Sequence, residues 1–343
     1  MPHDLLPHPR ETPAVVFDHP GPPEVLHWGS AQLREVGPHD VAIDVHAAGV
    51  NNADLLQRRG AYAVPAHAPD TLGLECAGRI AQVGSQVQEW EVGDAVCALL
   101  VGGGYAQRVV VPAAQVLPLP SGMDFVHAAA LPEAVCTVYS TLAMTAGVGP
   151  GDTVLVHGGG SGIGTTAIQW ALAVGARVLA TAGSDAKVQR VADLGATAIN
   201  YRTSDFVDEV LRATGGRGVD AVLDIVGVPY LARNIECLAP DGHLVIIGGD
   251  VSTASLDLSL LQKRRARISV TTLRARSDEQ KAAIVRAVRD RVWPHVEAGR
   301  LTPVIDTVLP ATDAARAHEL LSAGGTFGKV VLQFSDPGSS INC

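Results

Sequence analysis

The pattern of apolar and polar positions changes character near residue 125. Before it, from about residue 14 to residue 120, short alternating segments such as 41–45 and 107–111 are separated by Gly and Pro. This alternation predicts half-buried strands in a β-rich barrel with long connections. Beyond residue 125, apolar periodicities typical of helices and of buried strands follow one another. We therefore expect an α/β protein whose second part contains βαβ units and a parallel sheet covered on both faces.

The spacing of apolar residues locates the elements of this second part. Helices are expected at 125–147, 165–174, 185–194, 206–214 and 278–298. Strands are expected at 153–157, 177–181, 198–201, 220–225, 243–247 and 328–332. No internal repeat interrupts this succession.

Composition narrows the class of protein. The 343 residues are 47% hydrophobic and 18% charged, with a formal net charge of −9. Because phosphate neutralisation needs clustered Lys and Arg, this balance argues against general nucleic-acid binding. No apolar run approaches ~18 residues, so we expect no membrane span. Residues 1–10 lack the apolar core of a signal peptide, and five scattered Cys without a C-x-x-C pair indicate free thiols in a reducing cytoplasm.

A glycine-rich segment, HGGGSGIG at 157–164, follows a predicted strand and precedes a predicted helix. Gly159 and Gly164 fit the first and last positions of a G-x-G-x-x-G motif, whereas Ser161 stands at the middle position. Glycines permit a sharp turn and a close approach to a pyrophosphate, whose charge the helix N-terminus stabilises. The segment predicts a dinucleotide site. A glycine-rich turn without a ligand is the alternative, and it leaves five glycines in seven residues unexplained.

The strand after this motif bears on the choice between NAD and NADP. NAD-binding folds usually end it with Asp or Glu, which holds the adenosine ribose hydroxyl. Here the strand ends near Gly183, without an acidic residue. Ser184 and Lys187 follow, one turn apart at the N-terminus of a predicted helix. The serine hydroxyl, the lysine cation and the positive end of the helix dipole together suit a phosphate. Tyr201 would cover that phosphate or the adenine. This arrangement predicts NADPH. Binding of NAD is the alternative, because Asp185 could hold the ribose hydroxyl. In that case Ser184 would only cap the helix and Lys187 would be a solvated surface residue.

These features belong to a larger set of motifs. They are AGVNNADL at 48–55, GAY at 60–62, GLE at 73–75, LPEA at 131–134, the glycine-rich segment, LGA at 194–196, LDIVG at 223–227 and TLRAR at 272–276. Together they resemble the medium-chain dehydrogenase/reductase superfamily, and within it the zinc-free quinone oxidoreductases related to zeta-crystallin. The resemblance is closest to the branch of the tumour-suppressor-induced quinone oxidoreductase and covers residues 14–332.

The resemblance implies two domains. Residues 14–132 and 276–343 would form a catalytic domain with a GroES-like β-barrel. Residues 133–275 would form a Rossmann domain with a doubly wound parallel sheet, binding NADPH in the cleft between the domains. Residues 1–13 would be a disordered extension. Family members commonly pair through an edge strand of the Rossmann sheet, here 267–273, so we expect a homodimer.

The resemblance also bears on metal. Zinc dehydrogenases of this superfamily bind catalytic zinc through Cys, His and Cys, where this chain has Asn51, Leu74 and Glu133. The segment with four closely spaced Cys that holds a structural zinc is missing as well. Because a tetrahedral zinc site needs three or four converging ligands, we expect no metal.

Without a Lewis acid, the enzyme should reduce acceptors that take hydride readily and delocalise the new charge. Quinones and α,β-unsaturated carbonyls do so. The resemblance favours NADPH-dependent quinone reduction, and reduction of the activated double bond of enals or enones is the alternative. A catalytically silent cofactor-binding protein is a third interpretation, against which the intact glycine-rich segment weighs.

By resemblance, Asn51, Asp54 and Tyr62 would line the acceptor pocket, where the tyrosine ring would stack on a quinone. Tyr62 is otherwise a half-buried loop residue, and Asp54 is otherwise a helix cap or a partner of Arg58 or Arg59. No general acid is assigned, and water is the expected proton source.

The expected cofactor contacts fall into three groups. The nicotinamide would be bound by Thr137 and by the backbone of Gly248 and Leu273. The pyrophosphate would be bound by Gly158, Gly159, Gly162, Ile163 and Gly164. The adenosine ribose phosphate would be bound by Ser184, Lys187 and Tyr201.

Overall fold

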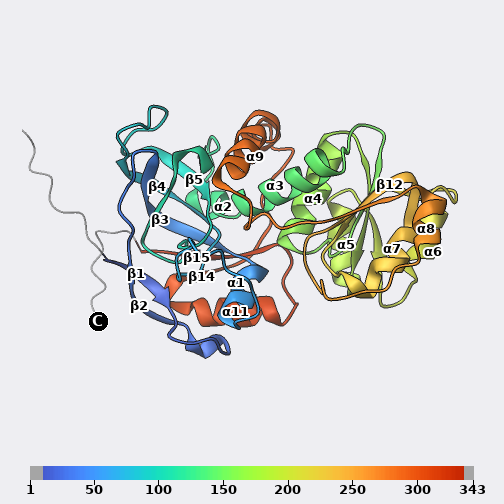
Figure 1. Ribbon diagram of the computed structural model, residues 1–343, viewed down its shortest axis with the longest axis horizontal. Coiled ribbons are helices and arrows are strands. Elements are labelled where there is room, and N and C mark those ends of the chain that lie inside the picture. The colour runs from blue at the N-terminus through green and yellow to red at the C-terminus, as the bar shows by residue number, and fades with distance from the viewer. Residues whose placement is uncertain (1–10, 336–343) are drawn as a thin grey trace, which may run out of the picture. The chain divides into compact units, whose positions relative to one another are not determined.

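The computed structural model describes residues 11–335 and divides into two compact units (Figure 1). Of the described residues, the first unit contains 11–133, 277–285 and 305–335, and the second contains 134–276 and 286–304. Residues 286–304 were predicted to belong to the first domain. The side chain of Gln169 links this segment to the second unit, because it accepts from the N–H of Thr302 at 2.9 Å and donates to its carbonyl at 2.9 Å.

The first unit is built on a seven-stranded sheet with the order β14-β15-β3-β4-β5-β7, and β6 pairs with β3. The strands predicted at 41–45 and 107–111 fall in β3 and β6. All the pairings are antiparallel except that of β14 with β15. The bounds are β3 Asp40–Val50, β4 Glu75–Val83, β5 Ala95–Leu99, β6 Arg108–Pro112, β7 Val116–Pro118, β14 Ile305–Pro310 and β15 Lys329–Gln333.

The start of the described chain corrects one expectation. Residues 11–13, assigned to a disordered extension, begin β1 (Glu11–Val16), which pairs antiparallel with β2 (His27–Gln32). Pro13 has no N–H to donate, but its carbonyl accepts from the N–H of Gln107 at 2.8 Å, so a strand position is tolerated there. The rest of the predicted extension, residues 1–10, lies outside the described residues.

The second unit contains a six-stranded parallel sheet with the order β10-β9-β8-β11-β12-β13. Counted from its own first strand, this is the order 3-2-1-4-5-6 of a Rossmann fold, which confirms the predicted doubly wound sheet. The strands are β8 Thr153–Val156, β9 Arg177–Ala182, β10 Thr197–Asn200, β11 Val219–Asp224, β12 Leu238–Ile246 and β13 Arg267–Val270.

Helices connect these strands, the first three close to their predicted positions and the last two not predicted. They are α4 Gly162–Ala173, α5 Asp185–Asp193, α6 Phe206–Ala213, α7 Leu231–Cys237 and α8 Leu258–Arg264. The central strand β8 is buried throughout, as a parallel strand covered on both faces must be. The predicted edge strand 267–273 is shorter than expected and ends at Val270.

Two predicted helices are interrupted at prolines. The stretch 125–147 forms α2 (Phe125–Ala128), α3 (Pro132–Val138) and a π-helix, η3 (Tyr139–Thr145). Pro132 begins α3, the helical position at which a missing N–H costs least. The stretch 278–298 forms α9 (Asp278–Arg291) and α10 (Trp293–Glu297), because Pro294 cannot donate the bond that would continue α9. The remaining helices are α1 (Asn52–Arg58) and α11 (Ala314–Ser322).

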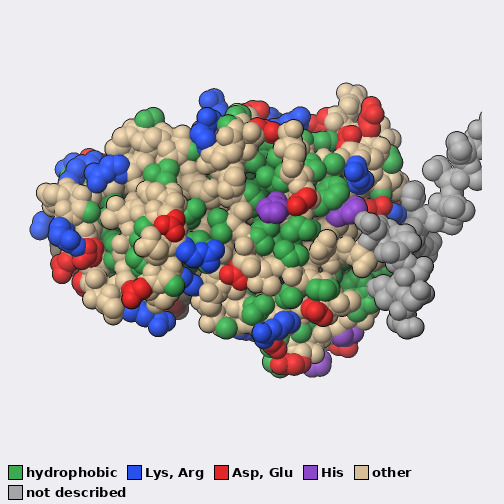
Figure 2. Space-filling view, turned by 180° about the vertical axis from the view of Figure 1, so that it is seen from behind, with side chains coloured by type: hydrophobic (Ala, Val, Ile, Leu, Met, Phe, Trp, Pro, Cys, Tyr) green, Lys and Arg blue, Asp and Glu red, His purple; other side chains and the backbone are tan. Residues whose placement is uncertain are grey.

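No helix between residues 11 and 335 has both the length and the apolar character that a membrane crossing requires. On the face shown in Figure 2, positive and negative side chains are largely interspersed. Cys76, Cys97, Cys136 and Cys237 are buried.

Candidate functional site

The glycine-rich segment forms the turn between β8 and α4. Gly158 has a φ of 69°, and a Cβ added to it would collide with Ile225. A Cβ on Gly164 would collide with the carbonyl of Gly158, so both positions require glycine. Ser161, which departs from the motif, caps α4 by accepting from the N–H of Gly164 at 3.0 Å. The result is a tight turn at the N-terminus of a 12-residue helix, an arrangement that suits a pyrophosphate.

The end of β9 carries the residues predicted to select the dinucleotide. A Cβ on Gly183 would stand 2.6 Å from the hydroxyl oxygen of Tyr201. Ser184 caps α5, and its Oγ accepts from the N–H of Lys187 at 3.4 Å. This is the capping role of the alternative interpretation, but a serine hydroxyl retains its own hydrogen for a ligand. Asp185 accepts from the side-chain amide of Asn200 at 2.6 Å. The Tyr201 hydroxyl therefore lies against Gly183, directly before Ser184 and the first turn of α5, which contains Lys187.

The residues predicted at the nicotinamide also lie in the second unit. Gly248 follows β12 and Leu273 follows β13, and these neighbouring strands are parallel, so both residues lie at the carboxyl edge of the sheet. The glycine-rich turn lies at the same edge. Thr137 is buried in α3, and its carbonyl accepts from the hydroxyl of Thr141 at 2.6 Å where η3 begins. Ligands of doubly wound folds bind at this edge.

In the first unit, Asn51 lies beside a buried ion pair. Lys329 Nζ donates to Glu75 Oε1 and, at 2.6 Å, to Asn51 Oδ1. Asn51 Nδ2 donates to Glu75 Oε1 at 2.9 Å, and the N–H of Glu133 donates to Glu75 Oε2 at 2.9 Å. The side chains of Glu75 and Lys329 are 0% and 6% exposed. These bonds fix the orientation of the Asn51 amide.

Lys329 is absent from the residues that the sequence analysis selected. The available signal was a lysine at the start of β15, directly before the apolar residues 330–332. A charged residue in such a strand requires a buried partner. The sequence does not show which partner, because Glu75 and Asn51 precede Lys329 by 254 and 278 residues.

The cluster around Asn51 does not suit zinc. Between residues 11 and 335 there is no group of three or more His, Cys, Asp or Glu placed to hold a metal ion. Beside Asn51, the carboxylate of Glu75 already binds the ammonium of Lys329, which would repel a divalent cation. A zinc site needs three or four converging N, O or S ligands.

Asp54 is fully buried and holds the beginning of α1. Its Oδ2 accepts from the N–H of Asn51 at 2.8 Å, and its Oδ1 accepts from the N–H of Gly73 at 3.0 Å. The hydroxyl of Tyr105 lies 3.4 Å from Oδ2. The first bond belongs to the capping box of α1, which is the capping role of the alternative interpretation, whereas the other two join Asp54 to Gly73 and Tyr105 and not to Arg58 or Arg59. Tyr62 is half-buried in the loop after α1.

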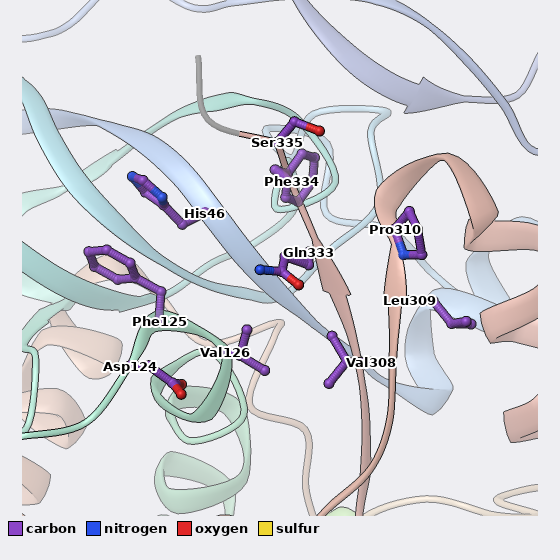
Figure 3. Close-up of a pocket in the computed structure, with 10 residues that line it drawn as sticks. All are labelled: His46, Asp124, Phe125, Val126, Val308, Leu309, Pro310, Gln333, Phe334 and Ser335. Atoms are coloured by element: carbon purple, nitrogen blue, oxygen red, sulfur yellow. The ribbon is translucent and has the colours of Figure 1, made fainter. Parts of the chain in front are cut away.

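A pocket of about 540 Å³ opens elsewhere in the first unit (Figure 3). The imidazole of His46 stacks on Phe125 with ring centroids 4.4 Å apart, and the Arg79 guanidinium lies 5.5 Å from the same ring. No residue predicted to bind acceptor or cofactor lines this pocket. Its lining consists of His46, Asp124, Phe125, Val126, Val308, Leu309, Pro310, Gln333, Phe334 and Ser335.

Family models match both units. Residues 37–121 match the alcohol dehydrogenase GroES-like domain, and residues 194–332 match the zinc-binding dehydrogenase family. The first match supports the description of the first unit as GroES-like.

Two curated relatives match over nearly their whole length. The quinone oxidoreductase of Pseudomonas aeruginosa is 34% identical over 318 residues, which is 91% of this chain and 96% of that protein. The 2-haloacrylate reductase of a Burkholderia species is 32% identical over 334 residues, 93% of this chain and 98% of that protein. By contrast, the chain spans only 15% of a much longer phenolphthiocerol/phthiocerol polyketide synthase component of Mycobacterium tuberculosis, at 33% identity over 96% of this chain.

Solved structures agree with these sequence matches. The Escherichia coli quinone oxidoreductase, solved as a complex with NADPH, superposes with a TM-score of 0.83 at 28% identity. The match covers 94% of this chain and 99% of that protein. The structural similarity therefore extends over both units.

Proposed function

The chain belongs to the medium-chain dehydrogenase/reductase superfamily of oxidoreductases, and from this premise we propose that it reduces quinones with NADPH and without zinc. The observation that carries the proposal is the buried cluster of Lys329, Glu75 and Asn51. It satisfies the Glu75 carboxylate beside Asn51 with an internal cation, so this donor set is not suited to the metal that would stabilise an alkoxide. Acceptors that delocalise the incoming charge do not need that metal.

NADPH is favoured over NADH by the end of β9. An acidic residue in place of Gly183 would run into the Tyr201 hydroxyl, which lies 2.6 Å from the Cβ position. Lys187 would provide a cation for the 2′-phosphate, and the Ser184 hydroxyl a further hydrogen bond. The first turn of α5 adds the positive end of its dipole.

The proposed division of labour follows from these residues. The glycine-rich turn would hold the pyrophosphate, and Thr137, Gly248 and Leu273 would bind around the nicotinamide ring. When bound, the reduced nicotinamide supplies a hydride. Asn51 and Tyr62 would orient the acceptor, and Asp54 would act indirectly by fixing the beginning of α1. A quinone gains a hydride and one proton from solvent to give the hydroquinone.

Reduction of an activated double bond is the second candidate. It is supported by the similarity to 2-haloacrylate reductase, whose name describes an α,β-unsaturated substrate. Enones and quinones accept hydride by the same principle, since both place the new charge on a conjugated oxygen. The two candidates differ in the acceptor and not in the proposed cofactor site.

Steady-state oxidation of NADPH and NADH, each with 9,10-phenanthrenequinone and separately with a 2-alkenal at equal concentration, tests the proposal. We expect turnover with NADPH and the quinone, unchanged by prior treatment with EDTA. Turnover only with the alkenal would favour the second candidate. Loss of activity with EDTA, restored by Zn²⁺, would contradict the zinc-independent mechanism.

A further inference from the structure

Four buried side chains form a continuous hydrogen-bonded series beneath the glycine-rich turn. His157 Nδ1 lies 3.0 Å from Thr181 Oγ1, and His157 Nε2 lies 2.7 Å from Asn234 Oδ1. Asn234 Nδ2 donates to Asp224 Oδ2 at 3.1 Å. At the other end, the N–H of Gly158 donates to Thr181 Oγ1 at 3.3 Å. Every one of the four side chains is at most 1% exposed.

The direction of the series follows from its acidic end. The carboxylate of Asp224 accepts from the N–H groups of Val226 at 2.7 Å and Gly227 at 3.0 Å, so it also takes the Asn234 bond as an acceptor. Asn234 Oδ1 then accepts from His157, which requires the proton on Nε2. Nδ1 is left as an acceptor for the Thr181 hydroxyl, whose oxygen accepts from Gly158. All the bonds thus run one way, from the turn to Asp224.

The imidazole is suited to remain neutral in this position. Burial lowers the pKa of His157 to about 4. The rings of Phe206 and Tyr230 pack on it with centroids 4.8 and 5.0 Å away. A neutral imidazole can donate at one nitrogen and accept at the other, as the series requires.

The series joins two loops at the carboxyl edge of the sheet. One is the glycine-rich turn after β8, and the other is 225–227 after β11, whose N–H groups bind Asp224. β8 and β11 are neighbours in the sheet, and Ile225 lies directly against Gly158. An apolar core of the same shape would serve stability as well as a buried polar series does. The polar series is therefore better explained by fixing the loops than by stabilising the fold.

We propose that Thr181, His157 and Asn234 are positioning residues of the dinucleotide site, which hold the Gly158 N–H and the 225–227 loop in the arrangement that receives the pyrophosphate. The inference rests on the proposed function only in that the chain binds a nicotinamide dinucleotide at this turn. It does not depend on the acceptor.

A pair of substitutions at Thr181 tests it. Thr181→Val keeps the shape but removes the hydroxyl, whereas Thr181→Ser keeps the hydroxyl. The main-chain bond from the Gly159 N–H to the Thr181 carbonyl, 2.8 Å, is available to both variants. Thr181→Val loses the bonds of the hydroxyl to His157 and to the Gly158 N–H, so the Kd for NADPH should rise about tenfold or more. Thr181→Ser keeps the hydroxyl, and its Kd should rise less than about threefold.

Adenosine 2′-monophosphate provides the internal control, because it lacks the pyrophosphate. Titrations followed by fluorescence and calorimetry should give the same Kd for this fragment in the wild-type chain and both variants. Equal weakening of NADPH and the fragment in Thr181→Val, or no weakening of either, would overturn the positioning role. A wild-type chain that binds NADPH but reduces neither quinone nor alkenal would defeat the proposed function while leaving this test intact. A chain that binds no dinucleotide would defeat both.

A second measurement needs only the wild-type fold. Nitrogen chemical shifts of ¹⁵N-labelled histidine, with the His157 signal assigned by its loss in His157→Gln, report which ring nitrogen carries the proton. We expect the Nε2–H form with an unprotonated Nδ1 throughout pH 5.5 to 8. The Nδ1–H form, or protonation near the ordinary histidine pKa, would contradict the one-way series.

Discussion

Lys329 Nζ donates to Asn51 Oδ1 over 2.6 Å although 278 residues separate them in the chain. The same ammonium binds Glu75, whose carboxylate is fully buried. The GroES-like unit thus contains a charge pair that joins β3, β4 and β15 at the residue expected to face the acceptor.

Replacing Lys329 by Met should destabilise the protein by about 3 kcal/mol, since it leaves the buried Glu75 carboxylate without its counter-ion. The Asn51 and Glu133 donors keep the loss from being larger. Urea unfolding measures the change. The double variant Glu75→Gln with Lys329→Met removes both charges and should recover most of the loss. A single variant as stable as the wild type would show that the pair is not coupled in solution.

Gly183→Asp should reduce kcat/KM for NADPH about 100-fold or more and move preference toward NADH. The new carboxylate would displace the Tyr201 hydroxyl and repel the 2′-phosphate, costing several kcal/mol at this site. Steady-state kinetics with both cofactors measure the change. Unaltered preference would mean that the adenosine ribose does not lie at the end of β9.

Lys187→Ala should raise KM for NADPH about tenfold and leave KM for NADH unchanged, because a charge-assisted bond to phosphate is worth about 1.5 to 3 kcal/mol. Lys263→Ala, a lysine of the same unit in α8, is the matched control and should change neither value. If both cofactors were affected alike, Lys187 would not recognise the phosphate.

Stability should fall as the pH drops from 6.5 toward 4. Burial lowers the pKa of His157 from 6.5 to about 4, so below pH 6.5 the unfolded chain takes up a proton that the folded chain does not. Above pH 6.5 both states are neutral and this contribution vanishes. At pH 5 the loss from His157 is roughly 2 kcal/mol.

Thermal unfolding of His157→Gln at pH 7.5 and pH 5 tests this linkage. The variant should lose less stability between the two pH values than the wild type does. His318, whose pKa burial lowers to about 3, contributes a similar dependence in the first unit and remains in the variant. An unchanged pH dependence in His157→Gln would show that this imidazole titrates normally.

We expect a homodimer formed through β13, because this strand pairs only with β12 in the described sheet and Val270 is 63% exposed. Light scattering should give twice the 35.6 kDa chain mass. Val270→Lys should give the monomer, whereas Val92→Lys, a similarly exposed valine of the first unit, should not. A wild-type monomer, or a dimer indifferent to Val270→Lys, would refute pairing at this edge.

Features encoded by local spacing were accessible from the sequence. The alternation of strands and helices predicted a parallel sheet covered on both faces, the family resemblance implied its Rossmann fold, and HGGGSGIG located its turn. Ser161 departs from the motif, yet it caps a residue only three positions further along the chain, Gly164. A serine before a predicted helix is a local signal of this kind of cap. The prolines at 132 and 294 are local signals for a helix break as well. Because the apolar periodicity continues on both sides of each proline, single helices were predicted across them.

Features that depend on distant partners were not accessible. Lys329 and Asn234 are chemically ordinary in the sequence, and only the fold shows that one is buried against Glu75 and the other against Asp224. Asp54 was predicted to line the acceptor pocket, with a capping role as the alternative. Its bond to Gly73 depends on a loop 19 residues away, which no local pattern indicates.

The first unit takes its strands from both ends of the chain, and this sets an order of events during synthesis on the ribosome. The second unit, 134–276 with 286–304, can fold once residue 304 has emerged, whereas β3 must wait for β15, its neighbour in the sheet. Until residues 329–333 are made, Glu75 lacks its lysine, and residues 47–50 of β3 have an open strand edge where β15 will pair. A nascent chain stalled before this point would hold a finished nucleotide-binding half attached to an aggregation-prone one.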